Sequence, residues 1–198
     1  SVLMPGVQHM RHTHLPDHKF VKGQPETGVE MAEDLERIAM NFGGENIAAC
    51  IIEPIAGSTG TLVPPKGYLK RIREICDKHG ILLIFDEVIT GWGRTGSAFA
   101  AQEWNVKPDI MTMAKATTNG VVPMGVVAVK EEIYDSVLDA SSAPEGTPEL
   151  FHGYTYSGIP VAVAAALAVQ DIFDKEDIFK RAKEMSPYLQ DGLQSLKD

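Results

Sequence analysis

The chain has 198 residues, of which 44% are hydrophobic and 23% are charged. This composition is typical of a globular domain with a hydrophobic core and excludes disordered and collagen-like chains. Aspartate and glutamate outnumber lysine and arginine by 27 to 18, and the resulting net charge of −9 argues against nucleic acid as a partner. No apolar run approaches the roughly 18 residues of a membrane-spanning helix, so we expect no membrane partner either.

The cysteines and histidines indicate neither a disulfide nor a metal site. Cys50 and Cys76 each lie in an apolar pattern, and two buried thiols are typical of a reducing compartment, so we expect a cytoplasmic protein. Residues 1–30 contain four histidines, at positions 9, 12, 14 and 18. No cysteine joins them and no helical pattern fixes their spacing, so we expect no metal centre.

Apolar periodicity predicts the first helices and strands. Residues 30–42 carry apolar side chains at helical spacing and end at two glycines. A continuous apolar run over 47–52 predicts a buried strand, residues 67–79 an amphipathic helix, and residues 81–85 a second apolar strand. Two fully apolar strands joined by a helix indicate a βαβ unit and a mainly parallel sheet flanked by helices, which is an α/β fold.

The second half of the chain continues this pattern. A third short strand is expected over 109–113 and a fourth within 121–129, followed by a loop over 139–157. A buried helix is expected to begin near Pro160, and apolar residues from 178 to 196 predict a last, long helix. We therefore divide the chain into an irregular lead-in segment (1–30), a core (31–175) and a terminal helix (176–198).

Polar residues follow the predicted strands at the points where these strands end. Glu53, Asp86 and Lys115 each come after an apolar run. In open parallel sheets ligands bind beyond the carboxyl ends of the strands, so we expect these three side chains to form one site. Asp86 could hold a protonated ring nitrogen, cap a helix or pair with Arg94. Lys115 is expected to be either a partly buried nucleophile or a surface lysine in a turn.

A further candidate lies before the helix at Pro160. Residues 153–158 read GYTYSG and offer three successive hydroxyl groups, those of Thr155, Tyr156 and Ser157. Hydroxyls at the start of a helix can bind a phosphate group. Alternatively, Ser157 simply caps the helix.

Four ordered motifs resemble those of the class III pyridoxal-phosphate-dependent aminotransferases. They are IEPIAG (52–57), FDEVITGWGRTG (85–96), PDI with AK and TNG (108–120), and HGYTYS (152–157). The resemblance implies the large domain of a fold-type-I transferase. Family members are about twice as long, so we expect this chain to be a central fragment that lacks a front half and a C-terminal domain. Alone, it should bind cofactor weakly and transaminate poorly.

The resemblance also implies roles for single residues. Lys115 would attach pyridoxal 5′-phosphate covalently and then move a proton between the substrate and the cofactor. Asp86 would bind the pyridine nitrogen and keep it protonated, and Val88 would cover one face of the ring. Thr155 would bind the cofactor phosphate in the neighbouring subunit's site, which implies a homodimer. Glu53 would lie near the substrate pocket.

Within the family, the chain is most similar to the ω-amino-acid:pyruvate enzymes. The resemblance implies transfer of an amino group from an ω-amino acid or amine, such as β-alanine, to the keto acid pyruvate. Trp92, Ala116 and Ile159 depart from the family's usual residues, which affects local pocket shape. Aminomutases and decarboxylases of class III share the lysine and the aspartate, so they stay open as alternatives. A non-catalytic truncated domain with a structural or interaction role is the other alternative.

Overall fold

The computed structural model describes residues 4–141 and 153–197. A four-stranded sheet in the order β1-β2-β3-β4 forms its centre, with strands β1 (Ala49–Ile52), β2 (Leu82–Asp86), β3 (Ile110–Met113) and β4 (Val126–Val129). The first three strands are parallel, and β4 runs antiparallel to β3. The predicted mainly parallel sheet with flanking helices is therefore confirmed. The twelve residues between β3 and β4 form no crossover helix, and a strand pair without one runs antiparallel.

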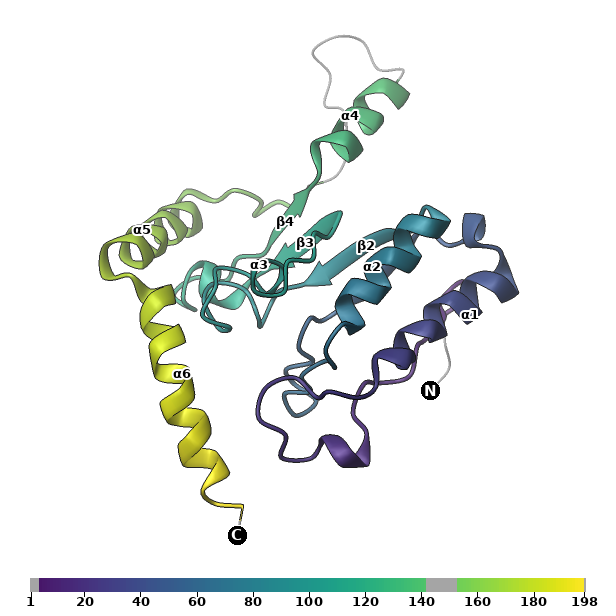
Figure 1. Cartoon of the computed structure of the whole chain (residues 1–198). Helices are drawn as coiled ribbons and strands as arrows, with labels where there is room; N and C mark the ends of the chain where they lie inside the picture. The colour runs from purple at the N-terminus through teal and green to yellow at the C-terminus, as the bar shows by residue number, and fades with distance from the viewer. Residues whose placement is uncertain (1–3, 142–152, 198) are drawn as a thin grey trace.

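Helices α1 (Glu33–Phe42) and α2 (Tyr68–His79) lie side by side and cover one face of the sheet (Figure 1). Leu83 and Phe85, alternate residues of β2, are fully buried in one cluster with Ile72 and Ile75 of α2. Removing each such side chain from water contributes roughly 1.5–3 kcal/mol. The amphipathic helix predicted over 67–79 is thus confirmed with its predicted apolar side inward.

The opposite face of the sheet is more open than the apolar strands led us to expect. Ile51 of β1 is 61% exposed, and Leu82 and Ile84 of β2 are half-buried. The prediction of a buried strand at 47–52 is therefore wrong for one of its two faces. A continuous apolar run predicts cover on both sides, whereas the described residues supply a full helical layer on the α1–α2 side alone.

The last two helices, α5 (Pro160–Glu176) and α6 (Ile178–Gln194), lie across the molecule from α1 and α2 (Figure 1). Helix α4 (Glu131–Ala140) extends beyond the end of β4, and the short helix α3 (Ala100–Glu103) lies between β2 and β3 in the chain. Helix α4 was not predicted from the sequence. The helix predicted to begin near Pro160 is confirmed as α5, but its predicted burial is wrong, because α5 buries only Ala162 and Val169. The long last helix is confirmed as α6. Most of the loop expected over 139–157, with His152 of the last motif, lies outside the described residues.

Short 3-10 helices complete the fold at η1 (Pro16–His18), η2 (Val29–Ala32), η3 (Gly44–Asn46) and η4 (Lys115–Thr117). Both cysteines are free and buried, as predicted. None of the helices in residues 4–141 and 153–197 is long and apolar enough to cross a membrane. The division into lead-in, core and terminal helix stays a prediction.

Candidate active site

The sheet brings the three predicted polar residues to one edge. Ile52 pairs with Phe85 across β1 and β2, and Asp86 pairs with Thr112 across β2 and β3. Glu53 directly follows β1, Asp86 is the last residue of β2, and Lys115 begins η4 just past the end of β3. Because these strands are parallel, all three residues lie at the carboxyl edge of the sheet, where α/β folds bind ligands.

Asp86 is half-buried and has one carboxylate oxygen available. Its Oδ1 accepts a hydrogen bond of 3.0 Å from the backbone N–H of Val88. Within residues 4–141 and 153–197, Oδ2 accepts no hydrogen bond, and Arg94 is exposed and forms no ion pair with Asp86. Side chains alternate along a strand, so Asp86 points to the same face as Ile84, away from α2. The ion pair with Arg94, one of the three alternatives for Asp86, is therefore wrong, and the carboxylate is free to bind a cation.

Lys115 is exposed, which agrees with the surface lysine that was one of the two alternatives and not with the partly buried lysine that was the other. Its backbone has a φ of 41°, in the left-handed region that L-residues rarely adopt. Such strain costs on the order of 1–3 kcal/mol and is frequent at functional sites. Among the described residues, none forms a hydrogen bond or ion pair with the Lys115 amine. An available amine thus stands on a constrained backbone just past the end of β3.

Glu53 is half-buried, and its Oε2 accepts a hydrogen bond of 3.0 Å from the Gly57 N–H. This bond closes the turn after β1 and fixes the carboxylate. Glu53 also lines a groove of about 1250 Å³ between β1, α1 and residues 6–14. The residue therefore connects the carboxyl edge of the sheet with the groove beside β1.

Val88 lies two residues beyond Asp86 and is half-buried, but Thr155 is in a different position. Thr155 lies on an exposed turn before α5, and no hydrogen bond between described residues connects it to Asp86 or Lys115. Ser157 Oγ accepts a hydrogen bond of 3.0 Å from the Tyr154 N–H, and the N-cap of α5 is Ile159 without a side-chain cap bond. Capping of the helix by Ser157, one of the two alternatives, is therefore wrong.

Glu87 organises the loop after β2, a role that the sequence analysis missed. Its side chain is fully buried. Oε1 accepts a hydrogen bond of 2.8 Å from the Ala101 N–H, and Oε2 accepts one of 3.0 Å from the Ala100 N–H and another from the Thr90 hydroxyl. A carboxylate is well placed at the start of α3, whose first N–H groups have no partner within the helix. The sequence does contain a signal for this role, which is a second acid directly after Asp86 with apolar residues on both sides of the pair.

At the opposite end of β3, Asp109 anchors the sheet. Asp109 is buried and forms ion pairs of 2.7 Å with Arg73 of α2 and 2.6 Å with Lys130, the residue after β4. It also accepts a hydrogen bond of 2.7 Å from the Leu83 N–H. Burial alone would raise the pKa of Asp109, but the hydrogen bonds from Lys130, Leu83 and Arg73 outweigh it and hold the pKa below its ordinary value. This network joins α2, β2, β3 and β4.

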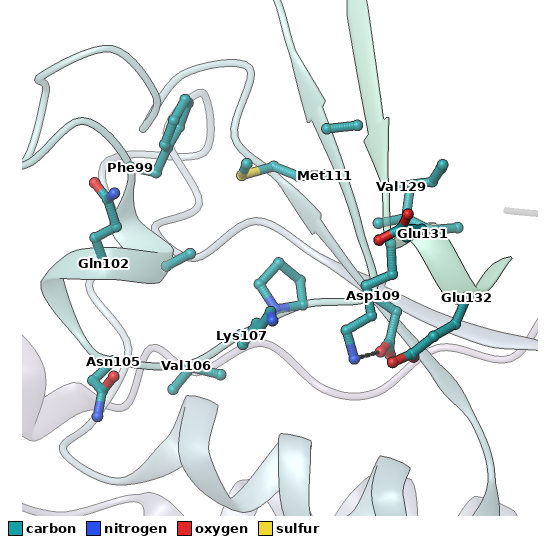
Figure 2. A pocket seen from close by; sticks show the side chains of 15 residues that line it. Phe99, Gln102, Asn105, Val106, Lys107, Asp109, Met111, Val129, Glu131 and Glu132 are labelled. Atoms are coloured by element: carbon teal, nitrogen blue, oxygen red, sulfur yellow. Dashed lines mark hydrogen bonds and ion pairs between the residues drawn. The ribbon is translucent and has the colours of Figure 1, made fainter. Parts of the chain in front are cut away.

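Asp109 also lines a pocket of about 690 Å³ next to α3 and β4, together with Phe99, Met111 and Val129 (Figure 2). The pocket opens beside the first residues of β3, whereas Lys115 follows the last. It is therefore separate from the edge that carries Asp86 and Lys115.

The residues at the carboxyl edge suit a cofactor that has both an aldehyde and a protonated ring nitrogen. An exposed amine can form a covalent bond with the aldehyde, and an unpaired carboxylate oxygen can accept a hydrogen bond from the ring N–H. Neighbouring strands are about 4.8 Å apart, so groups on β2 and after β3 can both reach one ring. Pyridoxal phosphate is a cofactor with both of these groups, so the residues present fit it.

Comparison with known proteins identifies the family. Residues 2–198 match the aminotransferase class-III family, so the chain belongs to this family of pyridoxal-phosphate-dependent enzymes. It is 55% identical over 197 residues to an omega-aminotransferase from Caulobacter vibrioides, covering 99% of this chain and 44% of the relative. It is 48% identical over 192 residues to a beta-alanine–pyruvate aminotransferase from Pseudomonas aeruginosa, covering 96% of this chain and 43% of the relative.

A solved structure gives the same result for the fold. A transaminase obtained by ancestral reconstruction superimposes with a TM-score of 0.87 at 38% sequence identity, covering 98% of this chain and 42% of the other. The chain therefore spans less than half the length of the relatives that it matches.

Proposed function

We propose that this chain carries the cofactor-binding centre of a transaminase that moves an amino group from an ω-amino acid or amine, such as β-alanine, to pyruvate. The observation that carries the proposal is the pair of Asp86 and Lys115 at neighbouring strand ends. Similarity to an omega-aminotransferase and a beta-alanine–pyruvate aminotransferase supports the choice of substrates.

In this proposal the residues of the chain divide the work. Bound pyridoxal phosphate supplies a conjugated ring that accepts the electron pair left when the substrate C–H bond breaks. Lys115 binds the cofactor. Once the substrate has displaced the Lys115 amine from the cofactor, this free amine carries the proton to and from the reacting carbon. The Asp86 carboxylate keeps the proton on the ring nitrogen, because a nearby negative charge favours the protonated ring. Val88 covers one face of the ring, and Glu53 lies near the substrate pocket.

Assembly is part of the proposal. The exposed turn of Thr155 makes this hydroxyl accessible to a second copy, so we propose a homodimer in which Thr155 binds the cofactor phosphate of the neighbouring site. Two buried free thiols agree with a reducing compartment, and we propose the cytoplasm.

The test is amino transfer measured with an isotope. The chain is incubated with pyridoxal phosphate, pyruvate and ¹⁵N-labelled β-alanine, and ¹⁵N-alanine is quantified by mass spectrometry. We expect slow formation of ¹⁵N-alanine that Lys115→Ala abolishes, because no other residue replaces the lysine in both of its steps. Absence of ¹⁵N-alanine from a chain that still binds cofactor would instead favour a non-catalytic domain or another class III reaction.

A further inference from the structure

The backbone of Lys115 needs partners that hold it in the left-handed region. A φ of 41° is unfavourable for lysine, and the same segment has two more positive φ values, 51° at Asn119 and 77° at Gly120. The peptide groups on both sides of Lys115 are hydrogen-bonded. The Lys115 carbonyl accepts a bond of 3.2 Å from the Gly120 N–H, and the Ala114 carbonyl accepts two bonds from Thr117.

Thr117 fixes the peptide group that precedes Lys115. Its backbone N–H and its Oγ1 both donate to the Ala114 carbonyl, at 2.9 Å and 3.0 Å. The torsion φ of Lys115 is the rotation next to this peptide group, so holding the Ala114 carbonyl restricts φ. Thr117 is 3% exposed, so water does not compete strongly for its hydroxyl.

Trp92 determines the direction of that hydroxyl. The indole Nε1–H of Trp92 donates a hydrogen bond of 3.0 Å to Thr117 Oγ1. An indole N–H can only donate, so the hydroxyl oxygen must accept, and its single proton is left to donate to the Ala114 carbonyl. The bond also connects the loop after β2 with the 3-10 helix that begins at Lys115.

Two aromatic rings hold the indole in place. Phe99 meets Trp92 edge to face at a centroid distance of 5.0 Å, and Phe173 of α5 stacks on it at 6.1 Å. Phe173 in turn packs against Phe179 of α6 at 5.2 Å. The direction of the indole N–H is therefore set by packing that does not involve Lys115.

We propose that Trp92 is a positioning residue for Lys115. Its N–H orients the Thr117 hydroxyl, the hydroxyl holds the Ala114 carbonyl, and the carbonyl keeps Lys115 in the backbone conformation that presents its amine beside Asp86. The part of this inference that concerns the cofactor rests on the proposed function. The part that concerns the backbone of residues 114–120 stands on the geometry of the chain.

The experiment compares five variants of the chain. Trp92→Phe keeps an aromatic ring and removes the N–H, and Thr117→Val keeps the side-chain shape and removes the hydroxyl. The third variant combines both changes, and Thr117→Ser restores a hydroxyl. Trp104→Phe makes the same aromatic change at a tryptophan that packs against the core on the α2 side. Each is measured by amide hydrogen exchange without cofactor, and by borohydride trapping of pyridoxal phosphate on Lys115 relative to exposed Lys70.

We expect exchange over residues 114–120 to become about two- to tenfold faster in Trp92→Phe, the change that loss of one hydrogen bond gives. Trapping on Lys115 should fall by a similar factor while trapping on Lys70 stays constant. Thr117→Val should change exchange and trapping by the same factors as Trp92→Phe. The double variant should differ little from either single variant, because both changes break the same chain of hydrogen bonds. Thr117→Ser and Trp104→Phe should match the unmodified chain at residues 114–120.

Three results would overturn the inference. They are unchanged exchange over 114–120 in Trp92→Phe, exchange that rises equally throughout the chain, and effects of the two single variants that add in full. The proposed function has a separate failure. If the unmodified chain traps no cofactor on Lys115 but the variants still speed exchange over 114–120, Trp92 positions this backbone and the cofactor assignment is wrong.

Discussion

Asp109 is a buried carboxylate whose contribution to stability is testable at the scale of a single residue. Asp109→Asn keeps an acceptor for the Leu83 N–H but leaves Arg73 and Lys130 without their shared anion. Removing one partner of a buried ion pair costs about 3–5 kcal/mol. Since Lys130 is partly exposed, we expect a loss of about 2–3 kcal/mol at neutral pH in urea unfolding. Asp77→Asn, which removes an exposed partner of the same Arg73, should cost under about 1 kcal/mol.

The unfolding free energy of the unmodified chain should exceed that of Asp109→Asn by an amount that decreases as the pH falls. The pKa of Asp109 is lower in the folded chain than the ordinary value of about 3.9 for an unfolded aspartate. The folded state therefore binds this proton less readily, and the stabilisation is complete above the unfolded pKa and lost as the pH falls through the folded pKa. Unfolding free energies of the two proteins should converge below about pH 4. A difference that stays constant from pH 7 to pH 3 would contradict this assignment.

Single residues also show what the sequence could and could not predict of the site. The positions of Glu53, Asp86 and Lys115 at one edge were predictable, because each follows an apolar run and parallel strands end together. The exposure of Lys115 was one of two alternatives that the sequence left open, and its left-handed backbone was not predictable. In our proposal that backbone conformation depends on Thr117 and Trp92, and Trp92 lies 23 residues earlier in the chain, where no local pattern marks the contact.

At the scale of elements, the two helices that pack on the sheet, α1 and α2, both end at a glycine. Gly80 ends α2 with a φ of 69°, and its N–H bonds to the Cys76 carbonyl. Gly80→Ala should cost about 1 kcal/mol, although a Cβ would meet no atom within 4 Å, because the backbone conformation itself is unfavourable for alanine. Thermal or urea unfolding measures this cost.

The control for Gly80→Ala is the same substitution at a glycine inside a helix, Gly192→Ala in α6. This glycine has open space around it and no positive φ. Alanine should stabilise the chain there by up to about 0.5–1 kcal/mol, because it loses less backbone entropy in a helix. Equal effects of the two substitutions would show that backbone conformation does not decide the outcome.

The elements that the sequence predicted share one property, which is a strong local period. Helices α1, α2 and α6 repeat apolar residues every three or four positions, and the strands are short apolar runs between turn residues. The burial of β1 and α5 was predicted wrongly because burial depends on neighbours from elsewhere in the chain. The antiparallel direction of β4 is likewise a property of the whole sheet.

At the scale of the whole molecule, apolar side chains remain on the surface of the sheet. Val127 of β4 is 64% exposed, on a strand at the edge of the sheet. Edge strands of this kind pair with other chains, and lysine at the edge prevents such pairing. We expect Val127→Lys to reduce concentration-dependent association in sedimentation experiments and to change the free energy of unfolding by under about 0.5 kcal/mol.

Val106→Lys is the matched substitution at a buried position. Val106 is 5% exposed and belongs to the hydrophobic core, so an unpaired ammonium there should cost at least about 3 kcal/mol. A large loss of stability in Val127→Lys would contradict the exposed position of β4.

Asp86 and Lys115 should bind pyridoxal phosphate together. The most direct measurement is borohydride reduction of the chain with increasing pyridoxal phosphate, followed by peptide mapping of pyridoxyl-lysine. We expect weak binding that labels Lys115 ahead of the other lysines at excess cofactor. Asp86→Asn should reduce this label about tenfold or more through loss of the charge next to the ring nitrogen, and Asp171→Asn on the surface of α5 should leave it unchanged. Label spread evenly over the lysines, or label on Lys115 that is indifferent to Asp86→Asn, would contradict the claim.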